Sequence, residues 1–403
     1  ALVPGLPFLP FILGTITLGG CAFVMSKASK RESEAAEIQN MPKATAPAKA
    51  SMGDMLDLDD IHVEFAPDLV EMVLDPGTGL DARIANMRNH VATAFGVLLP
   101  EIRLTDNASL PSGFYVVRVH GVEQVRDRLV PNRILALLSD DADVDLPGDN
   151  VSEPVYGAPA RWIPTSAQES AALAGLTTVQ PTEVLATHLL EVVKRNFPRL
   201  MTHKALRRRL SEMSNLTDPD RADANRKLLD ELIPDKVPID VLLAVLRLLL
   251  EERVSVRNLA LILEAVSEGR QLHQNVEGIT EHVRQRLGFQ LVAEMRRPDG
   301  TIPLVQLAPE WEDTFASYEI RSDRGSGDVA LPPDSFNALA DGIAAKLGQA
   351  ASAGTYAAVV TSMRRRRFLR TVMTAKGIMN PVLSFEEIGI DARPALVGLV
   401  PVA

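Results

Sequence analysis

The first 25 residues of the chain, Ala1 to Met25, contain no charged side chain and are mostly apolar. A hydrophobic stretch of about 18 residues or more is long enough to cross the hydrocarbon core of a bilayer as a helix. Lys27, Lys30 and Arg31 follow directly, and basic residues beside a membrane helix mark its cytoplasmic end. The sequence therefore predicts a transmembrane helix over residues 1–25, with the rest of the chain in the cytoplasm.

The start of this segment is unusual for a complete membrane anchor. The chain begins with Ala1 instead of Met and carries Pro4, Pro7 and Pro10, and membrane helices tolerate proline where neighbouring helices satisfy the freed carbonyl groups. We expect a fragment whose other membrane helices precede residue 1. The alternative is a lipoprotein cleaved before Cys21, which we disfavour because no basic region precedes the apolar run and because that run continues past Cys21.

The net charge and the cysteine content exclude two kinds of protein. The formal net charge is −10 and the isoelectric point is about 5.3, and an acidic protein is a poor match for the phosphates of nucleic acid. Cys21 is the only cysteine of the chain, so no disulfide framework forms within it. We therefore expect no nucleic-acid partner and a body that folds without disulfides.

The pattern of apolar residues changes twice beyond a polar, Ala-rich linker over residues 26–61. Strands and helices first alternate, including a helix expected over residues 80–95. Residues 201–285 are helical almost throughout, and an α/β pattern returns from residue 286 with a strand expected over residues 289–295. The expected fold class is a multidomain α/β region, in which α/β domains flank an all-helical domain, behind one transmembrane helix.

The end of the linker alternates acidic with apolar residues from Asp54 to Ile61. One interpretation is a solvated turn before the first strand. The other is a short docking segment that settles in a groove of a neighbouring subunit. The apolar residues available for such docking are Met55, Leu56, Leu58 and Ile61.

The sequence contains no motif for catalysis, metal binding or nucleotide binding. The seven histidines are scattered, and neither a zinc-binding pattern nor a P-loop occurs. We therefore expect no catalytic residues, no metal and no cofactor. The longest basic run, residues 364–367 with Arg370, is expected to form a solvated helix face, with an acidic partner or lipid headgroups as the alternative.

Several stretches resemble the export-gate family of bacterial type III secretion, which includes flagellar FlhA and its injectisome counterparts. The resemblance rests on EPVYGAPARWI at 153–163, ALAGLTTV at 172–179, PTEVLATHLLEVV at 181–193 and VLRLLLEERVSVRNL at 245–259. The anchor at residues 5–11 and the stretch at 381–388 also resemble this family, and all segments occur in the family's order.

This resemblance implies a protein of the bacterial inner membrane that spans the membrane several times and has a four-part cytosolic region. It implies a nonameric ring that receives flagellar export chaperone–cargo complexes and export ATPase components, beside other export-gate membrane proteins. Under the same resemblance, a first α/β subdomain comprises residues 62–131 plus 181–200, with an inserted subdomain at 132–180. A helical subdomain at 201–285 and a C-terminal α/β subdomain at 286–403 follow.

The resemblance also implies a hydrophobic dimple that binds export chaperones. Its members here are Glu153, Tyr156, Val179, Val184 and Thr187. Without the resemblance we would interpret the last four as core residues. Glu153 and Tyr156 replace the commoner Asp and Phe, and MTHKA at 201–205 stands where the family often has Gly-Arg-Gln-Glu. These departures keep a virulence injectisome gate as the alternative, and a membrane-anchored receptor or lipoprotein as a more distant one.

Overall fold

The computed structural model describes residues 58–138, 146–320, 328–389 and 392–402. Residues 59–403 form one compact unit. The predicted membrane helix over residues 1–25 and most of the predicted linker lie outside the described residues. In the part of the chain that is described, no helix is both long and apolar enough to span a bilayer.

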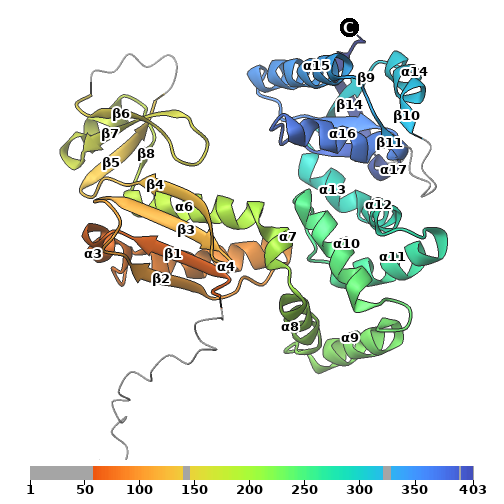
Figure 1. Cartoon of the computed structure of the whole chain (residues 1–403), viewed down its shortest axis with the longest axis horizontal. Helices are drawn as coiled ribbons and strands as arrows, with labels where there is room; N and C mark the ends of the chain where they lie inside the picture. The colour runs from red at the N-terminus through yellow and green to blue at the C-terminus, as the bar shows by residue number, and fades with distance from the viewer. Residues whose placement is uncertain (1–57, 139–145, 321–327, 390–391, 403) are drawn as a thin grey trace, which may run out of the picture. The chain divides into compact units, whose positions relative to one another are not determined.

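The first sheet has the strand order β2-β1-β3-β4, with β1 parallel to β2 and antiparallel to β3 (Figure 1). Buried and half-buried residues alternate along β1 because the side chains of one face pack in a core that this sheet shares with helices α4 and α6. The elements are β1 (Ile61–Phe65), η1 (Pro67–Leu69), α3 (Val70–Val73), α4 (Leu80–Phe95), β2 (Ile102–Asp106), β3 (Phe114–Val119), β4 (Val122–Arg128) and α6 (Pro181–Arg195).

A second, fully antiparallel sheet with the order β6-β7-β5-β8 occurs between β4 and α6 along the chain. It has a small core of its own around Ile134 and Ile163. The chain therefore leaves the first sheet after β4 and returns to it with α6. The elements are β5 (Arg133–Leu137), β6 (Asp149–Ser152), β7 (Pro159–Pro164), η2 (Thr165–Ala167), α5 (Gln168–Leu173) and β8 (Thr178–Val179).

A run of helices follows, and side-chain caps define several of its starts. The side chains of Thr202, Asp218, Asn258 and Asn275 accept hydrogen bonds from the first backbone N–H groups of α8, α9, α11 and α12. The elements are α7 (Phe197–Leu200), α8 (His203–Ser214), α9 (Pro219–Leu232), α10 (Ile239–Glu251), α11 (Leu259–Leu272), α12 (Val276–Arg286) and α13 (Gly288–Met295).

Helix α13 corrects the strand expected over residues 289–295. A short apolar run does not distinguish a strand from a buried helix, and here Leu291 and Val292 are buried while Phe289 is exposed. The start of this helix also packs tightly against α17. A Cβ added to Gly288 would lie only 2.3 Å from the carbonyl oxygen of Glu387. Only a residue without a side chain permits this close approach between α13 and α17.

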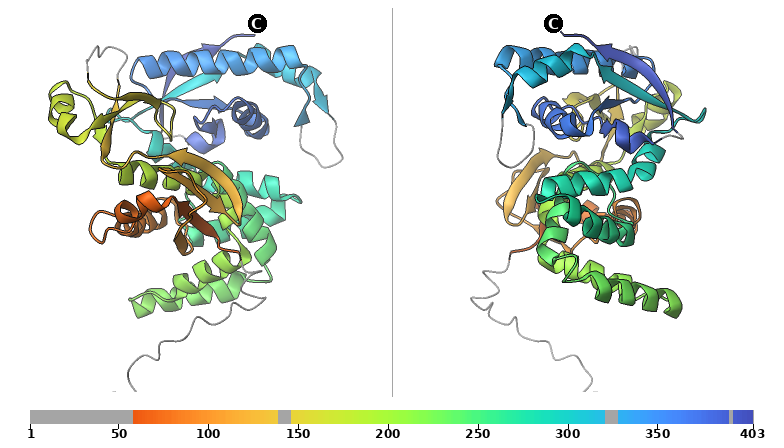
Figure 2. Two further views of the ribbon diagram at one scale, coloured as in Figure 1. Left: turned by 60° about the vertical axis from the view of Figure 1, so that its left-hand side comes forward. Right: turned by 90° about the vertical axis from the view of Figure 1, so that its right-hand side faces the viewer.

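The C-terminal sheet is parallel, with the order β13-β12-β9-β14. Both faces of β9 are buried, because Ile302 and Leu304 join the core shared with the helical run while Val305 and Leu307 join a second core with residues of α15 and α16. Figure 2 shows these two helices, in blue, beside the C-terminal sheet. The elements are β9 (Thr301–Leu307), α14 (Glu310–Ser317), β10 (Glu319–Ile320), β11 (Asp328–Val329), α15 (Pro333–Ser352), β12 (Ala358–Thr361), α16 (Met363–Ala375), β13 (Val382–Ser384), α17 (Phe385–Ile388) and β14 (Arg393–Val400).

The arginine run of α16 is not the uniformly solvated helix face that its sequence predicts. Arg364 and Arg367 are exposed, whereas Arg365 and Arg366 are buried. The Arg366 guanidinium binds the carboxylates of Glu252, which follows α10, and of Glu281 in α12. The run therefore contributes a buried ion network between the helical run and the C-terminal sheet.

Candidate functional site

A tight turn over residues 153–157 carries two of the predicted dimple residues. The Glu153 carboxylate accepts hydrogen bonds from the backbone N–H groups of Val155 at 3.0 Å and Tyr156 at 2.7 Å. Gly157 has a φ of 72°, which favours glycine, and its N–H donates to the Glu153 carbonyl oxygen at 2.9 Å. Glu153 thus fixes the backbone that presents Tyr156, in the way that a shorter Asp side chain closes an Asx turn.

Tyr156 combines an exposed ring with a tethered hydroxyl. The residue is 72% exposed, yet its Oη donates a hydrogen bond to Oε1 of Glu191 in α6 at 3.2 Å. Partial burial, followed by the negative charge of Glu191, raises the pKa of Tyr156. The ring is therefore held in place on the surface, as a rigid amphipathic group typical of binding interfaces.

Helix α6 carries two further dimple residues and begins at Pro181, where Gln180 and Glu183 form a capping box. Val184 is 2% exposed and packs into the core, whereas Thr187 is exposed. Thr187 precedes Glu191 by four residues, so the two side chains lie on the same side of the helix. Because Tyr156 is bonded to Glu191, the tyrosine and Thr187 belong to one surface.

Val179, in β8, is the last of the predicted dimple residues. Its strand pairs with β5, where Val179 lies opposite Leu135. Its half-buried side chain packs against the core that the first sheet shares with α6. The five predicted residues thus come from three elements. Tyr156 and Thr187 are exposed, Glu153 and Val179 are half-buried, and Val184 supports the helix from below.

Glu191 is not among the residues predicted from the sequence, although its carboxylate accepts the hydrogen bond from Tyr156. The residue is 4% exposed, and its carboxylate is bound by Tyr156 Oη, by Lys194 Nζ and by Nη2 of Arg253 at 3.4 Å. The only available signal was its spacing of four residues from Thr187. An acidic residue on a helix is more often solvated than buried, so the spacing alone did not identify it.

A buried polar pair supports α6 from the side of the first sheet. Tyr115 Oη and His188 Nδ1 lie 2.6 Å apart, and both residues are buried. Burial raises the pKa of Tyr115 well above its usual value and lowers that of His188. Both side chains are therefore neutral near pH 7, and the pair fixes the position of α6 against β3 next to Thr187.

The predicted docking segment is described only at its end. Met55 and Leu56 lie outside the described residues, and Leu58 is 60% exposed. Ile61 is fully buried as the first residue of β1, opposite Ile102 and Val119. Its side chain belongs to the core of the first sheet and is not available to a neighbouring subunit.

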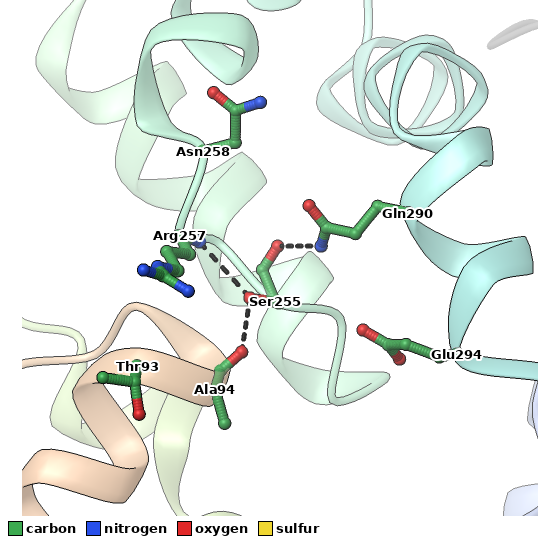
Figure 3. A pocket seen from close by; sticks show the side chains of 7 residues that line it. All are labelled: Thr93, Ala94, Ser255, Arg257, Asn258, Gln290 and Glu294. Carbon is green, nitrogen blue, oxygen red and sulfur yellow. Dashed lines mark hydrogen bonds between the residues drawn. The ribbon is translucent and has the colours of Figure 1, made fainter.

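A polar pocket of about 430 Å³ lies where α4, the residues before α11 and α13 meet (Figure 3). Ser255 joins these elements, because its Oγ donates to the Ala94 carbonyl oxygen at 2.6 Å while its own carbonyl oxygen accepts from Gln290 at 3.1 Å. The described residues contain no group of three His, Cys, Asp or Glu side chains suited to a metal ion. The pocket lining is Thr93, Ala94, Ser255, Arg257, Asn258, Gln290 and Glu294.

Comparison with known sequences gives a match over nearly the whole chain. The model of the FHIPEP family matches residues 1–393. The chain is 31% identical to flagellar biosynthesis protein FlhA of Caulobacter vibrioides over 99% of its own length and 56% of that relative. It is 25% identical to FlhA of Bacillus subtilis over 97% of its length and 57% of that protein. The chain thus spans a little over half the length of these curated relatives.

Solved structures show the same fold. The Chlamydia pneumoniae CdsV protein matches with a TM-score of 0.72 and 23% identity, over 85% of this chain and 97% of that one. Nonameric SctV-C of EPEC matches with a TM-score of 0.66 and 16% identity, over 85% and 98% of the two chains. These matches confirm the expected multidomain α/β fold class. On the family match over residues 1–393, the chain belongs to the FHIPEP family.

Proposed function

We propose that this chain is the C-terminal part of a flagellar type III export gate and serves as a docking platform. In this role it binds export chaperone–cargo complexes and passes their cargo towards the membrane channel. The proposal is supported by family membership and by the flagellar relatives, of which one is 31% identical over 99% of the chain. It requires recognition of proteins and no bond chemistry, so no cofactor is involved.

The observation that carries this proposal is the pairing of Tyr156 with α6. An aromatic ring that is 72% exposed but tethered through its hydroxyl offers a large contact area at little loss of side-chain freedom. Thr187 adds an exposed hydroxyl on the same surface, and Glu153 holds the turn. In this proposal Val179 forms part of the wall, and Val184 acts from beneath by holding α6 in place.

We further propose that the chain works in a ring. Two solved structures of relatives, one of EPEC SctV-C and one of the EscV cytosolic domain, are of nonameric assemblies. A ring multiplies weak chaperone sites through a high local concentration of sites. Leu58, together with Met55 and Leu56, is our candidate for docking on a neighbouring subunit.

The remaining partners are proposed from the family. We propose that residues 1–25 form the last membrane helix of a multi-pass protein of the inner membrane, where it meets other export-gate membrane proteins. Export ATPase components are further proposed partners, and the relative CdsV has been solved in a complex with CdsO. The proposed subdomains are 62–131 plus 181–200, 132–180, 201–285 and 286–403, behind the linker 26–61.

The second candidate function is the same gate in a virulence injectisome. It is favoured by the solved structures, which include the EscV cytosolic domain from a type III secretion system at a TM-score of 0.63. That structure is 18% identical to the chain, against 31% for the flagellar relative of Caulobacter. We therefore place the flagellar function first.

The test is a binding measurement with residues 58–403, which contain the compact unit. A flagellar export chaperone–cargo complex from the same organism should bind, and Tyr156→Ala or Thr187→Met should weaken binding at least tenfold. Loss of a good aromatic anchor costs about 2 kcal/mol, or roughly 30-fold in affinity. Tyr318→Ala is the matched control, since Tyr318 is an exposed tyrosine at the end of α14.

Each outcome of this measurement discriminates between the candidates. Tight binding that neither variant weakens would place the chaperone site elsewhere on the chain. Binding to needle-system chaperones, with no binding to flagellar complexes, would establish the injectisome function instead.

A further inference from the structure

The Glu191 carboxylate receives donors from three separate segments of the chain. Tyr156 belongs to the turn before β7, Lys194 to the last turn of α6, and Arg253 to the residues after α10. Tyr156 and Arg253 are 35 residues before and 62 residues after Glu191. One buried acid thus joins the proposed chaperone surface to the helical run.

The charge of Glu191 is balanced despite its burial. Burial alone would raise its pKa, but the cations of Lys194 and Arg253 and the hydroxyl of Tyr156 together lower the pKa. A carboxylate that stays charged is a stronger acceptor than a neutral group. The Tyr156 hydroxyl therefore meets a fixed acceptor and not a mobile one.

Arg253 is itself held by the fold. It adopts a φ of 58°, a conformation that residues with a side chain rarely take, and its N–H donates to the Leu250 carbonyl oxygen at 3.0 Å. The preceding residue, Glu252, is bound by the buried Arg366. Arg253 therefore approaches Glu191 from a segment that these two contacts hold in place.

We propose that Glu191 is a positioning residue for chaperone recognition, because its buried carboxylate holds the Tyr156 ring in its binding orientation against α6. This inference rests on the proposed function and deepens it. It assigns the geometry of the tyrosine anchor to a residue that a bound chaperone does not reach. In this proposal the chaperone contacts Tyr156 and Thr187. Lys194 and Arg253 hold the Glu191 carboxylate, which in turn holds the Tyr156 hydroxyl.

The experiment is a double-mutant cycle on chaperone affinity with Glu191→Gln and Tyr156→Phe. Tyr156→Phe keeps the ring and removes the hydroxyl, and Glu191→Gln keeps the shape and removes the charge. Each change should weaken binding about fivefold, the typical effect of one lost hydrogen bond. The double variant should bind no more weakly than the weaker of the two single variants, because both changes act on the same contact.

Glu183→Gln is the matched control. Glu183 lies in the same helix and pairs with Arg83 at 3.2 Å, and glutamine preserves its capping box. A second readout is the titration of Tyr156 followed by ¹⁹F NMR of fluorotyrosine-labelled protein, assigned with the Tyr156→Phe variant. Glu191→Gln should lower the pKa of Tyr156, and Glu183→Gln should leave it unchanged.

The outcomes separate this inference from the function on which it rests. If Tyr156→Ala loses binding while Glu191→Gln binds normally, Glu191 has no positioning role and the proposed function stands. Effects that multiply in the double variant would also overturn the positioning role. If Tyr156→Ala binds as tightly as the unchanged protein, the proposed site fails and this inference fails with it. Should Glu191→Gln not fold, Tyr156→Phe against Tyr318→Phe decides, since normal binding by Tyr156→Phe would exclude a role for the hydroxyl contact.

Discussion

Arg366 of α16 and Glu252, the residue that follows α10, form a buried two-point ion pair across 114 residues of sequence. Nη1 of Arg366 lies 2.5 Å from Oε2 of Glu252, and Nη2 lies 2.9 Å from Oε1. The same guanidinium binds Glu281 of α12 through Nε at 2.6 Å. Arg284 adds a second buried cation, with Nε 2.7 Å from Oε1 of Glu387. The C-terminal sheet is thus joined to the helical run by charge as well as by apolar packing.

Replacing Arg366 with Met should destabilise the fold strongly. The change would leave Glu252 and Glu281 without their shared cation, and removing one partner of a buried ion pair costs about 3–5 kcal/mol. Urea unfolding of residues 58–403 measures this loss. Arg367→Met is the control, because Arg367 is exposed on the same helix and should change stability by less than about 0.5 kcal/mol. Equal stability of the two variants would mean that the buried pair contributes little.

The ion network should also make the fold sensitive to acid. Burial by itself raises the pKa of Glu252, but Arg284 and Arg366 lower it overall. A carboxyl whose pKa is lower in the folded than in the unfolded state stabilises the fold above its unfolded pKa of about 4.3, and this stability is lost as the pH falls through the folded pKa.

The free energy of unfolding should therefore decrease below about pH 5. Glu252→Gln should show a smaller decrease over the same range when unfolding is followed at several pH values. Glu251 and Glu294 contribute with the opposite sign, because burial raises their pKa. If Glu252→Gln leaves the pH dependence of the free energy of unfolding unchanged, the acid sensitivity comes from other carboxylates.

Removing the hydroxyl of Tyr115 should cost about 1–3 kcal/mol, since Tyr115→Phe leaves Nδ1 of the buried His188 without its partner. Chemical denaturation provides the measurement. Tyr318→Phe is the control, because this tyrosine is exposed and its hydroxyl supports no described hydrogen bond. If both variants unfold at the same denaturant concentration as the unchanged protein, His188 does not depend on Tyr115.

Two glycine-to-alanine changes should have opposite signs. Gly288→Ala would place a Cβ 2.3 Å from the Glu387 carbonyl oxygen, so α13 and α17 would have to separate, at a cost of about 1–3 kcal/mol. Gly348 lies in α15 with no atom near its added Cβ, and alanine should stabilise that helix by roughly 0.5–1 kcal/mol. The midpoints of thermal unfolding should therefore lie on either side of the midpoint of the unchanged protein, and a lowered midpoint for both variants would contradict the open space at Gly348.

Periodic patterns in the sequence were sufficient to predict those helices and strands whose buried side chains recur at regular intervals. The helix expected over residues 80–95 is confirmed as α4, because Ile84, Met87 and Val91 recur on one buried face. The prediction of a strand over residues 289–295 was wrong, because an apolar run this short does not show whether its period is that of a strand or of a helix. Gly288, at the start of this helix, packs against a segment about 100 residues later in the chain, a contact that the local pattern does not contain.

The sequence by itself determined the family and the acidic, cysteine-poor character, and through motif resemblance it predicted Tyr156 and Thr187 as binding residues. These properties follow from residue types and short motifs, and they do not depend on which distant residues the fold brings together. Only the tertiary structure decided that Val184 and Ile61 are core residues, that Arg366 is buried, and that Glu191 holds Tyr156. These properties depend on partners between 35 and 114 residues away. Whether a charged side chain is solvated or paired is set by what the fold brings against it.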